Sequence, residues 1–395
     1  MASTPRARRL RWSAPFAVAA IIALIVAVPG LSAASTPTLP ALTPAQLIAK
    51  VQAANVTHLS GTIDMSTNLG IPDLSELTGL VGGGSGGESS DISELTGLLS
   101  GSHQALVWFA GATQNRVDLL QSMAETDVIH NGKDVWLWDS SSRTYSHSTV
   151  SDQHKDSERV DSPGEIKTPQ QVADDLLAHI SSSTTVSVTT PLNVAGRKAY
   201  ELVLAPHAAQ STIDHVTIAV DSVTGLPLQV EVFAKGQKAD AVKLGFGSIS
   251  FATPKASEFD FTPPPGSTAT NGASSPAHHR FHRMFGAKGA KGAKGAPMPA
   301  AVHVARPQTG TGAASKPQTS VTVGQDWTAV TIFSNVAIPP QLSQYLKAGT
   351  SVSGKFGQGT LFQTAVANIL VLKDGRIAVG AVNASALEAA VASAP

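Results

Sequence analysis

The chain has 395 residues, with 28 acidic and 28 basic side chains and no cysteine. This balance excludes a global field that would steer the protein to nucleic acid, so we predict no nucleic-acid partner. Without cysteine there is neither a disulfide framework nor a lipid-attachment cysteine. Packing alone must therefore hold the fold together.

The first 34 residues have the three parts of a signal peptide. Arginines at positions 6, 8, 9 and 11 precede an apolar stretch at 14–28, which small residues such as Ser32 and Ala34 follow. Cleavage before Ser35 would release the chain. An uncleaved stretch would anchor it, since about 18 apolar residues suffice for a span. Both outcomes predict an extracytoplasmic protein, secreted or held at the outer face of the cytoplasmic membrane.

Differences in composition divide the remaining chain into two predicted domains and a linker. Residues 266–320 lack a hydrophobic period and repeat Gly-Ala-Lys three times, which predicts a disordered linker. It separates a main domain at 43–265 from a small C-terminal domain at 321–395. An insertion at 69–101 contains an imperfect repeat around a glycine run. We interpret it either as a mobile flap over an opening or as a loop expansion.

Two helices are predicted in the main domain. Thr43 is a candidate N-cap for a helix at 44–54, with Pro44 at N1 and Gln46 at N3. Thr168 is a candidate N-cap for a helix at 169–180. Their apolar stripes include Leu47, Val51 and Leu176.

Alternating apolar and polar residues predict many strands, and Asn131 with Gly132 predicts a two-residue hairpin turn. The predicted strands are residues 56–69, 103–110, 116–121, 126–130, 133–139, 185–188, 198–204, 216–221, 226–234 and 241–251. Because a sheet this long curls, we expect an α+β fold. It would be a large curved antiparallel β-sheet, an open half-barrel with a helical lid, followed by a small α+β C-terminal domain. That domain should hold a hairpin at Asp374 and Gly375 and a helix capped by Ser385.

Several motifs match nucleotide-binding or catalytic signatures by letter only. Residues 82–87 fit a dinucleotide fingerprint and a nucleophile elbow, but they lie in low complexity without the required strand and helix. Residues 349–356 approximate a P-loop, yet Phe356 replaces the hydroxyl that binds magnesium, so we predict a turn before a strand. His278, His279 and His282 lie in the predicted linker, where a solvated role outweighs metal binding. We predict no catalytic residue, cofactor or metal.

Three tryptophans lie within the predicted strands. Trp136 and Trp138 share one face at strand spacing, and Trp108 lies on a neighbouring strand. They are either ordinary core or the wall of an apolar cavity.

Four segments carry a family resemblance: AETDVIHNGKDVWLWD at 124–139, VAGRKAYELVL at 194–204, VTIAVDSVTGLPLQVEV at 216–232 and FDFTPPP at 259–265. Together they resemble the LolA-like family of exported proteins in high-GC Gram-positive bacteria, relatives of the lipoprotein carrier LolA and the sigma-E regulator RseB. The resemblance covers about 43–265, and more weakly the tail at 327–331 and 374–382. It implies a curved sheet and a helical lid around a cavity for acyl chains, without enzyme chemistry.

We therefore expect an exported, non-catalytic protein that holds a lipid or lipoprotein acyl chain. The candidate cavity residues are Trp108, Val128, Trp136, Trp138, Val230, Leu47, Val51 and Leu176. The alternative is an RseB-like regulatory sensor that docks an anti-sigma factor or another membrane-protein partner. An envelope hydrolase is a third reading, for which no convergent polar groups are evident.

Overall fold

The computed structural model describes residues 38–70, 101–121, 123–149, 168–178, 180–270, 319–335 and 349–394. The expected signal segment, the inner part of the 69–101 insertion, the histidine cluster and nearly all of the predicted linker lie outside these ranges. Within them, no helix is long and apolar enough to cross a membrane.

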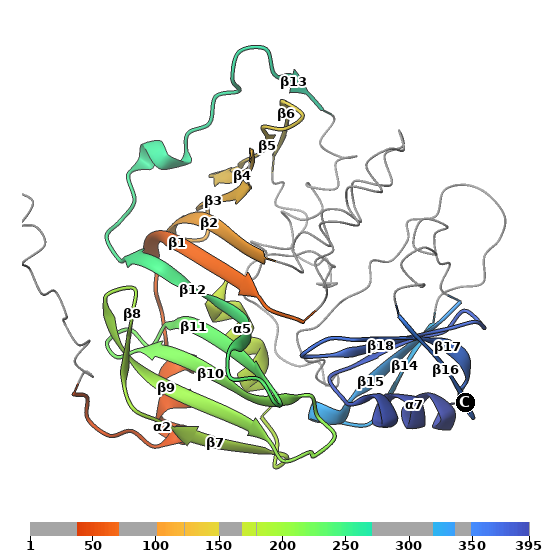
Figure 1. Ribbon diagram of the computed structural model, residues 1–395. Coiled ribbons are helices and arrows are strands. Elements are labelled where there is room, and N and C mark those ends of the chain that lie inside the picture. Colours follow the sequence, from red (N-terminus) through yellow and green to blue (C-terminus); the bar gives the residue numbers. More distant parts are fainter. Residues whose placement is uncertain are drawn as a thin grey trace, which may run out of the picture. The chain divides into compact units, whose positions relative to one another are not determined.

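The first sheet is 13-stranded and unclosed (Figure 1). Its strands are β1 (His58–Thr67), β2 (Gly101–Ala110), β3 (Gln114–Gln121), β4 (Ala124–Asn131), β5 (Asp134–Asp139), β6 (Thr144–Thr149), β7 (Thr184–Val188), β8 (Leu192–Val194), β9 (Arg197–Pro206), β10 (Ile213–Asp221), β11 (Pro227–Ala234), β12 (Asp240–Ser250) and β13 (Thr268–Ala269). Their order is β13-β6-β5-β4-β3-β2-β1-β12-β11-β10-β9-β7, and β8 pairs with β9. All pairs are antiparallel except β13 with β6. The expected large antiparallel sheet is thus confirmed, but β6, β8 and β13 were not predicted.

Helix α2 (Pro44–Gln52) begins as its sequence predicts. The Thr43 hydroxyl accepts a hydrogen bond from the Gln46 backbone, and the Gln46 side chain accepts one from the Thr43 backbone. This capping box satisfies two backbone donors that the first turn otherwise leaves unpaired. Helix α5 (Pro169–Ala178) starts in the same way, with Thr168 and Gln171.

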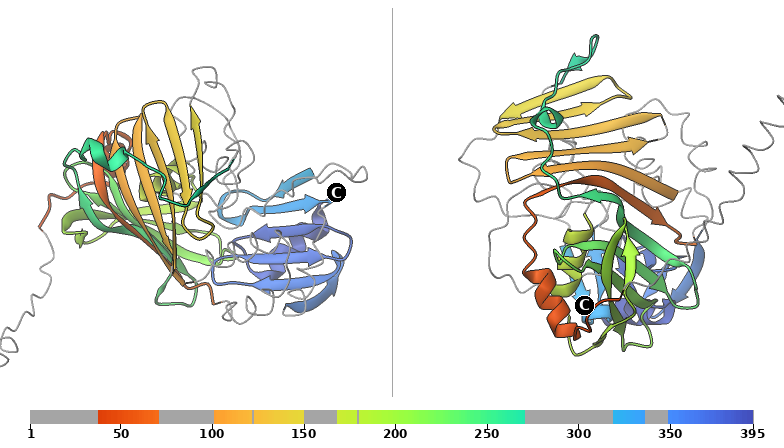
Figure 2. Two further views of the ribbon diagram at one scale, coloured as in Figure 1. Left: turned by 90° about the horizontal axis from the view of Figure 1, so that it is seen from above. Right: turned by 90° about the vertical axis from the view of Figure 1, so that its left-hand side faces the viewer.

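Residues 251–267, which we call the strap, connect β12 to β13 and run across the strands β1 to β6 (Figure 2). The strap contains the short 3-10 helix η1 (Ala256–Phe259), which contacts β3 and β4. Arg143 donates to the Pro265 carbonyl at 2.8 Å near its end. A single segment thereby crosses one face of this half of the sheet.

The second sheet has the order β14-β15-β19-β18-β17-β16. Its elements are β14 (Thr319–Val323), η3 (Asp326–Thr328), β15 (Val330–Ser334), β16 (Thr350–Gly354), β17 (Gly357–Gln363), β18 (Asn368–Leu372), β19 (Ile377–Gly380) and the helix α7 (Ala384–Ser393). The hairpin at Asp374 and Gly375 joins β18 and β19, as predicted. Two details differ. Residues 350–354 form a strand, so the turn predicted at 349–356 is confined to Lys355 and Phe356, directly before β17. The N-cap of α7 is Asn383, not Ser385, because the Asn383 side chain accepts from the Ala386 backbone at 3.0 Å.

Candidate functional site

Helices α2 and α5 pack on one face of the first sheet, which we call the helix face. Helix α2 contacts β7 and β9, and α5 contacts β11 and β12. Leu47 and Val51 of α2 are 0% and 1% exposed. They share a cluster with apolar residues of both helices and the sheet: Ala173, Leu177, Leu202, Ile218 and Val230. Burying one such aliphatic side chain contributes about 1.5–3 kcal/mol, so packing holds the helices in place.

The helix face continues across β1 to β5. Val107, Val117, Val128 and Leu137 are paired in register on β2, β3, β4 and β5. Directly paired residues project to the same face of a sheet, so the four form one apolar row, which we call the valine row. The row joins the helix-covered part through β1 and β12, where Met65 pairs with Leu244 and Leu244 with Val230.

The structure brings together only part of the predicted cavity set. Leu47, Val51 and Val230 are buried in one cluster, and Leu176 is packed against it. Val128 lies on the same face, farther along the sheet. These five residues share the helix face.

The three tryptophans lie on the opposite face, which corrects the expectation that they line a cavity with Val128 and Val230. Trp108 pairs with Arg116, Arg116 with Ile129, and Ile129 with Trp136. This row is one residue out of step with the valine row, and successive residues of a strand point to opposite faces. We call this surface the tryptophan face.

The strap covers the tryptophan face. Phe259 of η1 is buried, and the Phe261 ring lies 5.4 Å from the ring of Trp136 and 6.4 Å from that of Trp138. Trp136 also stacks on His147 at 4.0 Å. Trp136 and Trp138 therefore form part of a layer between sheet and strap, whereas Trp108 stacks on the Arg116 guanidinium, which lies 5.4 Å from the ring centroid.

A buried charge cluster lies beneath the strap. Arg116 Nε donates to Asp118 at 2.7 Å, Nη2 donates to Asp127 at 3.3 Å and Nη1 donates to the Glu258 carbonyl at 3.3 Å. Burial and the neighbouring Asp118 charge raise the pKa of Asp127 to about 7, against the opposing effect of Arg116. Burial also raises the pKa of Asp118 despite its ion pair with Arg116. One guanidinium does not fully compensate two buried carboxylates.

A carboxyl with a pKa near neutrality is the kind of group that proton-transfer catalysis uses. The Asp127 side chain, however, is only 6% exposed, and its partner is the Arg116 guanidinium rather than a nucleophile. Among the described residues, no group of three or more His, Cys, Asp or Glu side chains could hold a metal ion. The spacing Arg116-x-Asp118 within an otherwise half-buried strand was the sequence signal for this cluster.

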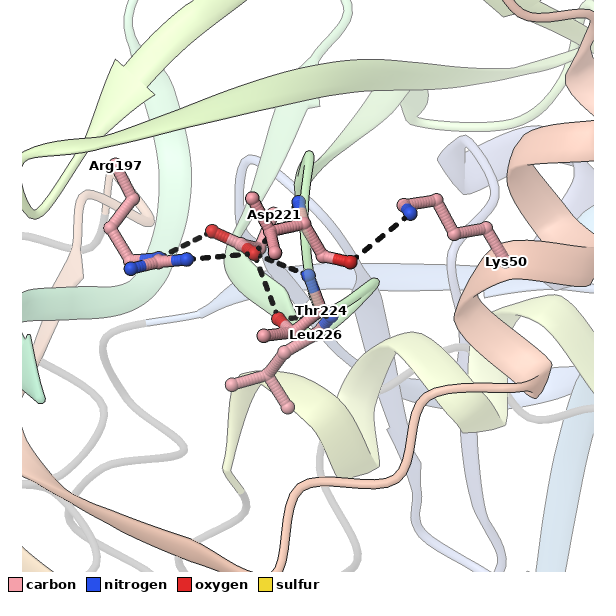
Figure 3. A network of polar contacts seen from close by, with 6 residues as sticks. Lys50, Arg197, Asp221, Thr224 and Leu226 are labelled. Carbon is pink, nitrogen blue, oxygen red and sulfur yellow. Dashed lines mark hydrogen bonds and ion pairs between the residues drawn. The ribbon is translucent and has the colours of Figure 1, made fainter. Parts of the chain in front are cut away.

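A second polar network fixes the end of α2 (Figure 3). Asp221 accepts hydrogen bonds from Arg197 and, through Oδ1, from the backbones of Val223 and Thr224 at 3.0 and 2.7 Å. Burial alone would raise the pKa of Asp221, but these hydrogen bonds lower it below its ordinary value. Lys50 Nζ of α2 donates to the Val223 carbonyl at 3.3 Å. The β10–β11 turn is thus shaped by Asp221 and holds the last turn of the helix.

Gly225 in this turn provides a stability test. It has φ +77°, and a Cβ there would lie 2.5 Å from the Lys50 carbonyl oxygen. We expect Gly225→Ala to lower the free energy of unfolding by about 2–4 kcal/mol through strain and clash. Gly236, with φ +80° and no atom within 4 Å of a built Cβ, is the matched control and should lose only about 1 kcal/mol. Equal losses in urea denaturation would contradict the close approach of α2.

The Asp127 cluster predicts a pH dependence. A carboxyl whose pKa is higher in the folded state binds protons more tightly there, so stability falls as pH rises from the unfolded value toward about 7. Between pH 5 and pH 8 this group should remove about 2–3 kcal/mol. Asp127→Asn should flatten the dependence in urea unfolding, whereas Asp240→Asn in β12 should not. An unchanged slope in Asp127→Asn would refute the assignment.

No family model and no curated protein matches the sequence. The structure is similar to MucB in a MucA complex from Pseudomonas aeruginosa, with a TM-score of 0.37 and 14% identity, covering 87% of this chain and 94% of that one. A conserved protein from Thermus thermophilus gives a TM-score of 0.30 and 9% identity over 57% of this chain and 98% of the other. A LolA superfamily protein from Nitrosomonas europaea gives 0.22 and 10% over 56% and 99%. These three scores assign no family, so a function has to rest on the residues of this chain.

Proposed function

We propose that the protein is an exported, non-catalytic binding protein that holds the acyl chain of a lipid or lipoprotein on the helix face. The observation that carries the proposal is the apolar row on β2 to β5, in which Val107, Val117, Val128 and Leu137 continue the surface on which α2 and α5 pack. Val107, Val117 and Leu137 are only 7%, 8% and 7% exposed, so an acyl chain laid along this row would take the place of the protein atoms that now cover it.

Apolar burial supplies about 25 cal/mol per Å² and has little directional preference. A binding site of this kind fits many chain lengths, which suits carriage of acyl groups rather than recognition of one molecule. The N-terminal segment 1–34 supports export, through cleavage or anchoring. Acyl groups are available in the envelope, where such a protein would work.

Acyl binding can be tested first on the protein purified from its own host. Native mass spectrometry should show an acyl lipid bound to the full chain. A fluorescent fatty acid should then bind to delipidated protein and be displaced by unlabelled palmitate. A clean apo mass together with no fluorescent binding would refute the proposal.

Two matched variants then locate the site. Val128 and Leu106 are both half-buried aliphatic residues, but Val128 lies on the helix face, whereas Leu106 pairs with Asp118 and lies on the tryptophan face. We expect Val128→Asn to weaken probe binding about five- to tenfold, because an amide then replaces an apolar contact. Leu106→Asn should change it less than about twofold. Thermal unfolding should first show that both variants are folded. If Leu106→Asn weakened probe binding more than Val128→Asn did, the binding site would have to lie on the tryptophan face.

A second candidate function is supported by contacts between the residues that follow α5 and the short 3-10 helix η3 of the C-terminal part. Asp326 Oδ2 accepts hydrogen bonds from Ser181 Oγ at 2.6 Å and from Ser183 Oγ at 2.8 Å. Trp327 Nε1 donates to Thr184 Oγ1 at 2.7 Å. Asp326 has φ +49°, a conformation that few non-glycine residues adopt. A ligand that displaced α5 would disturb these contacts, and this favours a sensor that presents its C-terminal part to a membrane-protein partner such as an anti-sigma factor.

Hydrogen–deuterium exchange tests this coupling in the full chain. Saturating fluorescent fatty acid should increase exchange in residues 319–334 as well as in α5. Asp326→Gly keeps the positive φ without strain while removing the carboxylate, so residues 319–334 should already exchange fast in this variant and respond no further. Protection of 319–334 that is unaffected by ligand in the wild-type protein would exclude the sensor.

A further inference from the structure

Two polar side chains interrupt the apolar helix face at β3 and β4. Asn115 pairs in register with Phe109 on one side and with His130 on the other, and His130 pairs with Val135. Asn115 is two residues from Val117 and therefore shares the face of the valine row. Asn115 and His130 are only 1% and 9% exposed. Buried polar side chains in such surroundings require hydrogen-bond partners.

The partners of these two residues fix the orientation of the Asn115 amide. His130 Nε2 lies 3.0 Å from the Gly132 carbonyl oxygen, which can only accept, so Nε2 carries the hydrogen. His130 Nδ1 is then an acceptor, and Asn115 Nδ2 donates to it at 3.4 Å. The same Nδ2 donates to the Ala112 carbonyl at 3.5 Å. Turning the amide over would place Oδ1 against two acceptors, which electrostatic repulsion disfavours.

Asn115 Oδ1 has no hydrogen-bond partner. Three other buried side-chain oxygens in the described residues share this property: Asp127 Oδ1, Gln170 Oε1 and Asn368 Oδ1. Asp127 lies under the strap, and Asn368 lies in the second sheet, where its Nδ2 donates to the Val382 carbonyl at 2.7 Å. Gln170 lies on helix α5, where its Nε2 donates to Asp174 Oδ1 at 2.7 Å. Of the four, only Asn115 stands on the strands of the face to which we assign the acyl chain. An unpaired buried acceptor is unfavourable, and a donor on the bound molecule would remove the penalty.

We propose that Asn115 Oδ1 accepts a hydrogen bond from the bound molecule, so that the helix face selects acyl compounds with an N–H or O–H donor next to the chain. Acyl amides and acylglycerols with a free hydroxyl have such a donor, and fully substituted esters and amides lack it. The inference rests on the proposed acyl-binding function and gives the apolar site its one directional contact.

A pair of amides tests the donor preference. N-methylpalmitamide has one N–H, and N,N-dimethylpalmitamide has the same chain and carbonyl but no donor. Each displaces a fluorescent fatty acid from the full chain, and the ratio of the two dissociation constants is measured. We expect Asn115→Leu to reduce the wild-type preference for the N–H amide by about three- to tenfold, the contribution of one hydrogen bond.

Asn368→Leu is the matched control, because it removes the same kind of unpaired amide from the second sheet. Its ratio should equal that of the wild-type protein, and thermal unfolding should show that both variants are folded. A ratio that is the same in the wild-type protein and in Asn115→Leu would overturn the inference while leaving acyl binding intact. Failure of both amides to displace the probe would instead overturn the proposed function.

A second measurement needs no variant. With ¹⁵N-labelled N-methylpalmitamide bound to the wild-type protein, the amide proton should shift downfield from its position in an apolar solvent, because it donates to a carbonyl oxygen. An unshifted proton would mean that Asn115 Oδ1 is left unpaired or is paired with water, and would overturn the inference.

Discussion

The antiparallel register of β1 to β6 is the constraint on which the other features depend. A strand alternates its side chains between two faces, so a shift of one residue in any pair would exchange the valine row and the tryptophan row. The observed register places Val117, Val128 and Leu137 together on the helix face, and Arg116, Ile129 and Trp136 together on the tryptophan face. Each row is then covered differently, and the two faces acquire different chemistry.

The strap crosses the tryptophan face, and burial beneath it raises the pKa of Asp127 to about 7. The Asp127 carboxyl is unfavourable there, since a single guanidinium serves two carboxylates. Beside this cluster, Phe259 of the strap is buried and the Phe261 ring packs against Trp136. On the helix face the unfavourable group is a different one, the buried Asn115 Oδ1, which has no hydrogen-bond partner. A bound donor can remove that penalty, and the two faces therefore differ in whether an external molecule could stabilise them.

The two helices are held to the helix face in different ways. Helix α2 is fixed at its end by Lys50 and the close approach of Gly225. Residues just beyond α5 contact Asp326 and Trp327, which belong to the C-terminal part of the chain. Displacement of α5 by a ligand would disturb the hydrogen bonds of Asp326 and Trp327. The proposed carriage and the proposed sensing could thus use the same displacement.

The sequence by itself determined the local features. The Thr43 capping box, the β4–β5 hairpin, the hairpin at Asp374 and most strands depend on residues a few positions apart, so their patterns are readable without a structure. The turn of the β4–β5 hairpin was misplaced by one residue: Asn131 pairs with Asp134, so Gly132 and Lys133 form the turn rather than Asn131 and Gly132. It also determined that Trp136 and Trp138 share a face. Only the tertiary structure decided which face that is, because alternation within a strand does not say what covers each side. The strap has no hydrophobic periodicity that would have predicted its position. The roles of Asn115, His130 and Asp127 depend on strand pairing and on burial by segments distant in the sequence.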